Sequence, residues 1–301
     1  MTNLPLVSII TVNYNGVKVT TAMLESLKKI TYPSYEVIVV DNASHENPDI
    51  LKENYPWITL IKSPVNKGFA GGNNIGFEAA HGKYFLLLNN DTEVAPDFLE
   101  YLVEKLESDP KAGAASSKVI FFNTDNVIQY AGGGSINPLT GRGSFIGTSE
   151  KDTFQYASRI TNHAHGAAVM VKREVVEKVG AMPELYFLYY EELDFCELIK
   201  RGGYTIWYIA ESVVYHKESM TIGRENALKV YYMTRNRILF MRRNHPGFSL
   251  VVFYLYFFLF AFPKNILSYT IKRRIDLLKA FLKGVVWNFK SLAKIEKEKQ
   301  F

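Results

Sequence analysis

The residues that say most about this chain are Tyr84-Phe85-Leu86-Leu87-Leu88-Asn89-Asn90-Asp91-Thr92-Glu93. The apolar half of this run predicts a strand buried on both faces, because neither face of such a strand can meet water. The run then changes abruptly to Asn89-Asn90-Asp91. Open α/β sheets bind ligands just beyond the carboxyl ends of their strands, so a carboxylate here suits a divalent cation. A polar turn that leads into a helix over 92–108 is the alternative.

The preceding residues repeat one pattern, in which an apolar strand ends in Asn or Asp and a helix follows. Strands are expected over 6–12, 35–40 and 58–61, with a helix over 17–29. This alternation predicts an α/β fold with parallel strands and right-handed crossovers. Asp41 ends the second strand, where nucleotide-binding folds place an acidic group for a ribose or base. A turn cap is the alternative role for Asp41.

A glycine-rich segment over 67–76 precedes a helix expected over 73–80. Glycine permits close backbone approach, and a helix start can present N–H groups to an anion. The signal is weak, because the segment has neither the Gly-x-Gly-x-x-Gly spacing after a strand nor the Gly-Lys-Ser/Thr of a P-loop.

Four segments, taken in order, resemble the family 2 glycosyltransferases and, among these, the bacterial rhamnosyltransferase-type enzymes. They are SIITVNYN at 8–15, VVDNAS at 39–44, NKGFAGGN at 66–73 and LNND at 88–91. The resemblance extends to about residue 245. It implies a GT-A fold, which is a Rossmann-like, mostly parallel sheet flanked by helices, and a nucleotide-sugar donor.

The resemblance also implies roles for single residues. Asp91 takes the last position of an Asp-x-Asp-type motif, whose first acid is replaced here by Asn89. His216 joins Asp91 and the donor diphosphate around Mn²⁺ or Mg²⁺, which suits imidazole and oxygen ligands. The residues implied for nucleotide binding are Thr11, Val12, Asn13, Asn15, Asp41, Asn42, Lys67, Gly68, Gly71, Asn73 and Asn90.

Three acids follow an aromatic run and begin a helix expected over 191–201. They are Glu191, Glu192 and Asp194. Aromatic neighbours exclude water, which raises the pKa of a carboxylate and makes it a better base. The segment resembles the family's Glu-Asp-x-Asp motif, in which the second acid is the base, and that position is Glu192. The sequence leaves open which acid reaches the acceptor.

The second half of the chain offers weaker signals. A strand is expected over 163–171, and its start, His165-Gly166-Ala167, is implied by the resemblance to line the acceptor and sugar side. The pair of histidines at its start favours a hydrogen-bonded pocket wall over a metal site. Strands are also expected over 204–208 and 212–215. Arg235 is a candidate phosphate ligand, and a solvated helix face is the alternative.

The composition bounds the setting. The 301 residues carry a net charge of +5, and the excess of Lys and Arg lies after Lys264. That placement favours an anionic membrane surface over nucleic acid. The single cysteine, Cys196, excludes an internal disulfide framework and a Cys-ligated zinc site. Residues 248–262 are almost wholly apolar but short of the ~20 that span a bilayer, which favours an interfacial helix.

We therefore expect a glycosyltransferase domain over 1–245, with a nucleotide-binding half over 1–110 and an acceptor half over 111–245. A membrane-associating tail over 246–301 would hold it on the inner face of the cell membrane. The expected reaction is inverting transfer from dTDP-rhamnose or a UDP-sugar to a saccharide or lipid-linked acceptor in surface polysaccharide synthesis. A nucleotidyltransferase and a non-catalytic sugar-binding protein are the alternatives, and a homodimer is left open.

Overall fold

The computed structural model describes residues 4–217 and 226–291 and divides into two compact units. The first contains Met1–Ser135, Ser144–Phe187 and Glu191–Thr221, and the second contains Ile136–Gly143, Leu188–Tyr190 and Ile222–Phe301. The domain boundaries expected near residues 110 and 245 stay a prediction.

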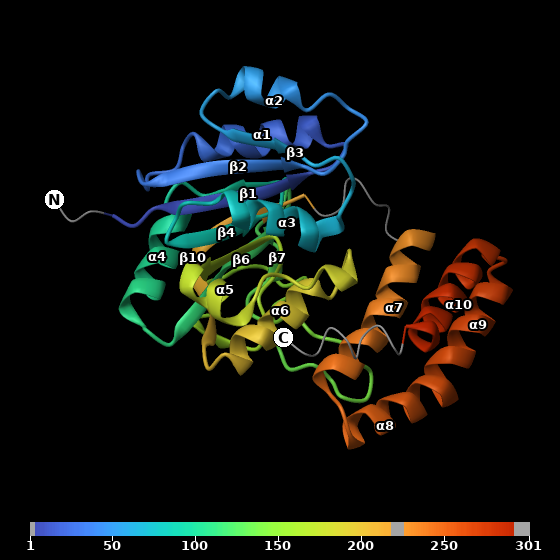
Figure 1. Cartoon of the computed structure of the whole chain (residues 1–301). Helices are drawn as coiled ribbons and strands as arrows, with labels where there is room; N and C mark the ends of the chain where they lie inside the picture. Colours follow the sequence, from blue (N-terminus) through green and yellow to red (C-terminus); the bar gives the residue numbers. More distant parts are fainter. Residues whose placement is uncertain (1–3, 218–225, 292–301) are drawn as a thin grey trace. The chain divides into compact units, whose positions relative to one another are not determined.

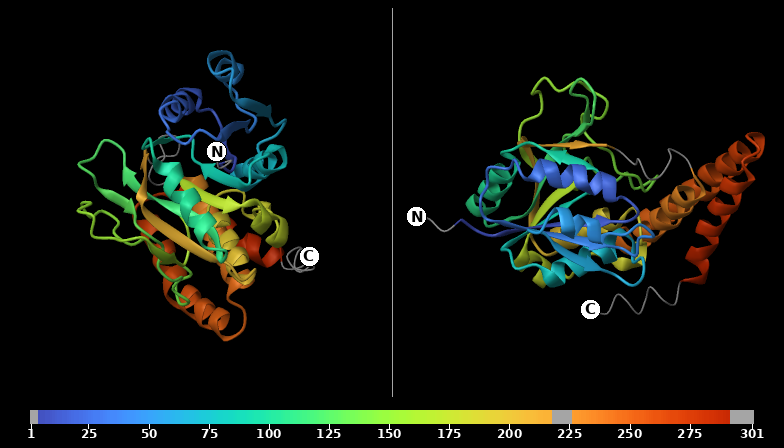
Figure 2. Two further views of the ribbon diagram at one scale, coloured as in Figure 1. Left: turned by 90° about the vertical axis from the view of Figure 1, so that its left-hand side faces the viewer. Right: turned by 90° about the horizontal axis from the view of Figure 1, so that it is seen from above.

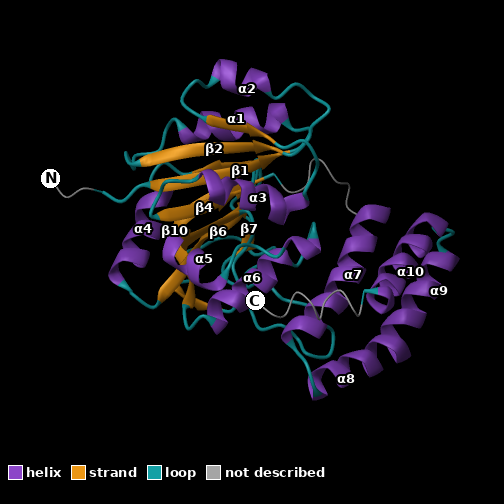
Figure 3. Cartoon of the chain, viewed as in Figure 1, coloured by secondary structure: helices purple, strands orange, loops and turns teal. Residues whose placement is uncertain are grey.

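The first unit is built on one ten-stranded sheet with the order β3-β2-β1-β4-β9-β6-β10-β5 (Figures 1 and 3). Two further strands lie off this path, since β7 pairs with β6 and β8 pairs with β10. The strands are β1 (Val7–Asn13), β2 (Tyr35–Asp41), β3 (Thr59–Lys62), β4 (Tyr84–Leu88), β5 (Thr92–Val94), β6 (Ala112–Phe121), β7 (Ile128–Tyr130), β8 (Arg159–Thr161), β9 (Ala168–Lys172) and β10 (Thr205–His216).

Helices cover both faces of this sheet (Figure 2). The core on one face takes its apolar side chains from α1, α2 and α4, and the core on the other face takes them from α3, α5 and α6. The helices are α1 (Val17–Leu27), α2 (Asp49–Asn54), α3 (Gly68–Ala79), α4 (Phe98–Ser108), α5 (Arg173–Val179), the short η1 (Glu184–Tyr186) and α6 (Glu191–Arg201). The α/β class and the GT-A architecture are confirmed.

The expected parallel pairing holds for β3, β2, β1 and β4, whereas β9 runs antiparallel to both β4 and β6. Ala168, the first residue of β9, pairs with Leu88, the last residue of β4. The loop that precedes β9 therefore arrives at the carboxyl end of β4. This antiparallel insertion brings the middle of the chain to the edge where the parallel strands end.

Three sequence-based expectations are wrong in detail. Thr92–Val94 is the strand β5 and not the start of a helix, because it pairs antiparallel with the end of β10. The strand expected from His163 begins at Ala168. The strands expected at 204–208 and 212–215 form one strand, β10, whose pairing with β6 shifts between Ile209 and Val213. In each case a neighbouring strand overrode the local pattern.

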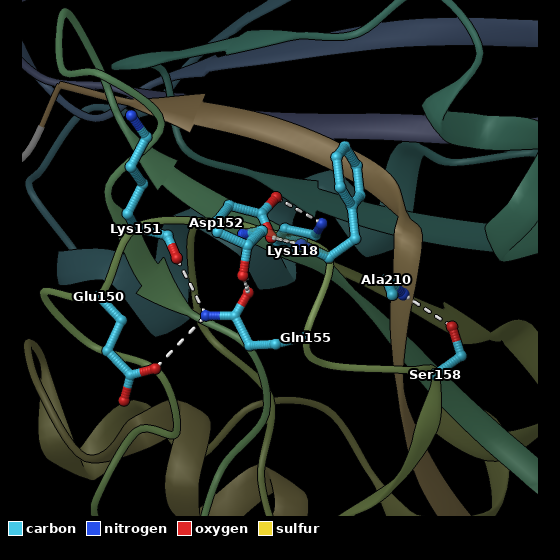
Figure 4. A network of polar contacts seen from close by, with 9 residues as sticks. Lys118, Glu150, Lys151, Asp152, Gln155, Ser158 and Ala210 are labelled. Atoms are coloured by element: carbon cyan, nitrogen blue, oxygen red, sulfur yellow. Dashed lines mark hydrogen bonds and ion pairs between the residues drawn. The ribbon is translucent and has the colours of Figure 1, made fainter.

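A buried ion pair fixes the long loop that follows β7. The Nζ atom of Lys118, on β6, lies 2.7 Å from Oδ2 of Asp152, and both side chains are largely buried (Figure 4). The Oγ atom of Ser158 accepts a hydrogen bond from the backbone N–H of Ala210 on β10. These two contacts hold the loop against β6 and β10. Separating Lys118 from Asp152 would leave a buried charge without compensation, which is costly.

The second unit consists mainly of helices over residues 226–291. It comprises α7 (Ala227–Asn244), α8 (Phe248–Tyr256), the π-helical segment η2 (Phe257–Ala261), α9 (Phe262–Ile271) and α10 (Ile275–Lys290). Gly284 of α10 allows close packing on α7, because a Cβ there would lie 2.8 Å from the carbonyl oxygen of Tyr231.

The segments α8, η2 and α9 form one helix of 24 residues, Phe248–Ile271, which is apolar and long enough to cross a membrane. At 1.5 Å per residue it extends about 36 Å, longer than a hydrocarbon core of about 30 Å. The helix therefore continues to Ile271, beyond the apolar stretch 248–262 on which the sequence-based expectation rested. The expected interfacial placement stays a prediction.

Replacing Gly76 by alanine should destabilise the first unit. A Cβ at Gly76 would lie 2.2 Å from Cγ2 of Ile10 on β1. The overlap should cost about 1–3 kcal/mol, more than the ~1 kcal/mol that alanine gains over glycine in a helix. We expect a lower urea midpoint for Gly76→Ala. In the double variant with Ile10→Ala, the two effects should partly cancel; strictly additive losses would contradict this packing.

Replacing His163 by leucine should flatten the pH dependence of stability. Burial, together with the charge of Lys200, lowers the pKa of His163 to about 4. Between pH 6.5 and 4 the unfolded chain binds a proton there that the folded chain does not, so folding stability falls as pH falls. We expect urea unfolding to lose roughly 1–2 kcal/mol more in wild type than in His163→Leu between pH 6.5 and 4.5. Parallel curves for the two proteins would contradict this.

Candidate active site

The carboxyl ends of β1 and β2 meet at Asn13 and Asp41, which are direct partners in the sheet register. Nδ2 of Asn13 donates to Oδ1 of Asp41 at 2.7 Å, and the backbone N–H of Ser44 donates to Oδ2 at 3.1 Å. The backbone N–H of Asn15 donates to Oγ of Ser44, which ties the two loops together. Both Asp41 oxygens therefore order the loop beyond β2.

A chain of side-chain hydrogen bonds connects this point to the end of β4. Oγ1 of Thr20, on α1, donates to Oδ1 of Asn13 at 2.9 Å. Oγ1 of Thr20 in turn accepts from Nδ2 of Asn90 at 3.0 Å. Asn90 precedes Asp91, so the polar residues that end β1, β2 and β4 belong to one network.

The glycine-rich segment lies beside this edge, although its helix begins at Gly68 and not at Asn73. The backbone N–H of Gly68 donates to Oδ1 of Asn66, and that of Phe69 donates to the carbonyl of Phe187. These first donors are thus already used within the protein. A Cβ at Gly72 would lie 2.8 Å from Val12, so glycine here allows α3 to approach the end of β1.

The position of Lys67 is set by the loop that follows β2. Oδ1 of Asn42 accepts from the backbone N–H of Lys67 at 2.9 Å, and its Nδ2 donates to the carbonyl of Gly68. Asn42 is buried, and Asn73 inside α3 is buried as well. The remaining nucleotide-binding candidates, Thr11 and Gly71, are also buried, on β1 and α3. All the nucleotide roles assigned from the sequence stay predictions.

The candidate metal ligands Asp91 and His216 face each other. Oδ1 of Asp91 lies 3.0 Å from Nε2 of His216, and Nδ2 of Asn89 lies 3.5 Å from the same nitrogen. Pairing of His216 with Thr92 in the β5–β10 ladder places the two residues together. Sequence spacing gives no sign of this contact.

Gln129 on β7 orients the His216 ring. Oε1 of Gln129 lies 2.8 Å from Nδ1 of His216, and a proton on Nδ1 would donate to this oxygen. The lone pair of Nε2 then points at the Asp91 carboxylate. Two acceptors 3.0 Å apart repel each other unless a proton or a cation lies between them, so this donor set fits Mn²⁺ or Mg²⁺.

The protein supplies only part of a metal coordination sphere here. Among the described residues, no group of three or more His, Cys, Asp and Glu side chains is arranged to hold a metal ion. Two protein ligands leave most positions of an octahedral ion to oxygen atoms from elsewhere. A bound diphosphate can supply such oxygens, which fits a metal that binds together with its substrate.

The loop before β9 lies beside Asn89 and His216. The backbone N–H of Asn89 donates to the carbonyl of Ala167 at 3.0 Å. Nδ1 of His165 accepts from the backbone N–H of Ala167 at 3.0 Å, and the His165 ring lies 5.7 Å from that of His216. Burial, and then the charge of His216, lowers the pKa of His165 to about 3. His165 is therefore a neutral wall residue.

The three acids at the start of α6 differ in exposure. Glu191 is 3% exposed and Asp194 is fully buried, whereas Glu192 is half-buried. Cγ of Glu192 lies 3.9 Å from the place that a Cβ of Gly166 would occupy. Glu192 is thus the acid that borders the loop before β9. The helical turn explains the difference, since neighbouring residues point in directions about 100° apart.

The structure adds two residues that the sequence did not suggest, Thr20 and Gln129. Thr20 is a buried hydroxyl inside an amphipathic helix, and Gln129 is a buried amide between apolar neighbours in β7. A polar residue inside an apolar run is the signal that could have found Gln129. Arg235 lies instead in the second unit, buried among Tyr231, Tyr232 and Trp287, so its phosphate role stays a prediction.

Several known proteins are similar to this chain in sequence. The N-acetylglucosaminyl-diphospho-decaprenol L-rhamnosyltransferase of Mycobacterium tuberculosis is 21% identical over 74% of this chain and 80% of its own length. The low-salt glycan biosynthesis hexosyltransferase Agl10 of Haloferax volcanii is 25% identical over 77% of this chain and 74% of its own length. An uncharacterized Sinorhizobium fredii protein, y4gI, is 26% identical over 81% of this chain, which spans 28% of that protein's length.

Solved structures with the same fold include a mannosyltransferase of Pyrobaculum calidifontis in complex with GDP-Man and Mn²⁺. It aligns with a TM-score of 0.60 at 18% identity over 96% of this chain and 88% of its own. TarS 1–349 of S. aureus in complex with UDP-GlcNAc aligns with a TM-score of 0.59 at 16% identity over 93% of this chain and 81% of its own. The family described as Glycosyl transferase family 2 matches residues 8–180, more than half of the chain. This chain therefore belongs to glycosyltransferase family 2 and is a glycosyltransferase enzyme.

Proposed function

We propose that this protein transfers a sugar, with inversion, from a nucleoside-diphosphate donor to a hydroxyl group of a saccharide or lipid-linked acceptor, and that a divalent metal assists. The observation that carries the proposal is the 3.0 Å approach of Asp91 Oδ1 and His216 Nε2. Asp91 follows Asn90, which belongs to the hydrogen-bond network of Asp41, and Glu192 borders the loop that precedes β9.

The nucleotide would bind over the ends of β1 and β2, where Asn13, Asp41 and Asn42 order two adjoining loops. Ligands of open α/β sheets bind at this edge. The donors named with related structures, UDP-GlcNAc and GDP-Man, are nucleotide sugars. For this chain we propose dTDP-rhamnose or a UDP-sugar, with the rhamnosyl choice supported by the mycobacterial relative.

Asp91 and His216 would hold the metal, with Gln129 keeping the imidazole proton on Nδ1. The bound ion would supply positive charge that neutralises the leaving diphosphate. Asn89 lies within 3.5 Å of Nε2 and replaces a second acid. A site with a single carboxylate should bind the metal weakly until the diphosphate contributes its oxygens.

Glu192 would act as the base. Its carboxylate takes the proton from the acceptor hydroxyl, whose oxygen attacks the anomeric carbon in line with the bond to the diphosphate. That bond breaks, and its electron pair leaves with the nucleoside diphosphate. Glu192 is partially exposed and lies beside Gly166, which supports it as the base over the more buried Glu191 and Asp194. His165, Gly166 and Ala167 would line the acceptor side.

The alternatives make different predictions. A nucleotidyltransferase would release diphosphate from a nucleoside triphosphate, and a binding module would release nothing. The facing pair of Asp91 and His216 gives a non-catalytic protein no obvious use. Hydrolysis of nucleotide sugars in the presence of Mn²⁺, without acceptor, distinguishes the glycosyltransferase from both alternatives, and release of diphosphate from a nucleoside triphosphate distinguishes the other two.

The exposed apolar face of the Phe248–Ile271 helix supports association with the inner face of the cell membrane. Exposed lysines on α9 and α10, such as Lys264 and Lys283, favour anionic lipids. A lipid-linked acceptor would explain this attachment, and the relative's diphospho-decaprenol substrate is of that kind. Peripheral or monotopic attachment and a homodimer both stay predictions.

Replacing Asp91 by asparagine should abolish metal-assisted transfer, because a neutral amide cannot balance the cation. We expect turnover of a UDP-sugar with Mn²⁺ to fall by roughly a hundredfold or more. Binding of Mn²⁺ in the presence of UDP, followed by electron paramagnetic resonance, should weaken in parallel. Asp97→Asn at the exposed start of α4 is the matched control. Full turnover in a folded Asp91→Asn enzyme would remove Asp91 from the metal site.

Replacing Glu192 by glutamine should remove the base and leave the donor site intact. We expect kcat to fall by about 10²–10⁴ while the affinity for UDP changes little. Glu197→Gln, on the same helix and paired with Lys200, is the control and should keep its activity. If Glu192→Gln retains its kcat while Asp194→Asn loses it, the base is Asp194.

A further inference from the structure

A buried arginine in the second unit has no carboxylate partner among the residues that the structure describes. Arg237 of α7 is 8% exposed, and its Nε atom is buried without a hydrogen-bond partner. Over residues 4–217 and 226–291, no carboxylate pairs with it. Burial lowers the pKa of the Arg237 guanidinium, which reflects the cost of holding this cation out of water. Buried charges are normally paired, so an unpaired one needs an explanation.

Neighbouring Arg235 shows what a structurally used arginine looks like in the same helix. Its guanidinium lies 4.7 Å from the ring centres of Tyr232 and Trp287, and its Nε donates to Oδ1 of Asn236 at 2.7 Å. Arg235 is thus held by aromatic rings and an amide. Within the described part of the chain, Nε of Arg237 makes no such hydrogen bond, so packing alone does not account for its charge.

A second arginine, Arg142, is close enough for its charge to act on Arg237. Arg142 is exposed, and its positive charge contributes to lowering the pKa of Arg237. The preceding residue, Gly141, has φ +64°, and a Cβ there would lie 3.1 Å from Cγ of Arg237. The hydroxyl of Tyr190 donates to the carbonyl of Gly141 at 2.9 Å. The loop that carries Arg142 is therefore fixed in place against the stem of Arg237.

An aromatic ring lies beside Arg237. The guanidinium carbon of Arg237 lies 5.4 Å from the ring centre of Phe257, the first residue of η2. The helix that contains Phe257 exposes a row of apolar side chains, which includes Val251, Leu255 and Leu259. A ligand of this place would carry an anionic group for the arginines and an apolar chain for the helix.

We infer that Arg237 and Arg142 bind the phosphate group of a lipid phosphate, which rests on the lipid-linked acceptor proposed above. Two guanidinium groups can hold phosphate oxygens through several charge-assisted hydrogen bonds. The phosphate would neutralise the buried cation, and the apolar chain would lie along the exposed helix face. The lipid phosphate comes from one of two sources, the acceptor or the bilayer.

The test is binding of farnesyl diphosphate to the full chain in neutral detergent, measured by calorimetry without donor. We expect saturable binding that weakens at least about tenfold in Arg237→Gln and less in Arg142→Gln. Lys111→Gln, at an exposed position of the first unit, removes the same charge and should change nothing. Because no donor is present, absence of this binding in the wild-type chain would count against the phosphate site and not against glycosyl transfer.

Two further measurements complete the test. The melting temperature of Arg237→Gln without ligand should not fall, since the variant removes an unpaired buried charge; should it fail to fold, the exposed Arg142→Gln decides. Flotation with phosphatidylcholine vesicles, with and without phosphatidylglycerol, identifies the source. Loss of phosphatidylglycerol binding alone in Arg237→Gln assigns a bilayer headgroup, and loss of farnesyl diphosphate binding alone assigns the acceptor. Equal losses in Arg237→Gln and Lys111→Gln, or no loss in either arginine variant, would overturn the inference.

Discussion

The strand Tyr84–Leu88 constrains everything around it, because it is buried along its whole length and hydrogen-bonded on both edges. Its parallel neighbour β1 ends at Asn13, and its antiparallel neighbour β9 begins at Ala168. The carboxyl end of β4 therefore meets the end of one strand and the start of another. Loops from three distant parts of the sequence converge there, and they carry Asn15, Asp91 and His165.

A second pairing has the same kind of consequence. The short strand β5 follows Asp91 directly and is held antiparallel to the end of β10, which places His216 against the Asp91 carboxylate. A shift of one residue in this ladder would turn His216 to the opposite face of the sheet. Oε1 of Gln129 lies 2.8 Å from the other ring nitrogen, Nδ1. The chemistry of the site thus depends on strand register as much as on residue type.

Buried charge is handled in two ways in this protein. Lys118 and Asp152 neutralise each other, and this pair holds a long loop in place. Arg237 is buried to a similar degree without a carboxylate among the described residues. The Lys118–Asp152 pair stabilises the fold, whereas burying Arg237 without a carboxylate would favour binding of an anion at that residue.

Local patterns along the chain were enough for the α/β class and for the polar residues that end each parallel strand. They also marked Asp41, Asp91 and the acids of α6, because an abrupt change from apolar to polar residues is a local feature. They misjudged Thr92–Val94 and the length of β10, where pairing with a remote strand outweighs propensity. Contacts such as Asp91 with His216, or Glu192 with Gly166, lay beyond reach. Strand order and register bring such residues together, and these are settled by packing across the whole sheet and not by any one segment.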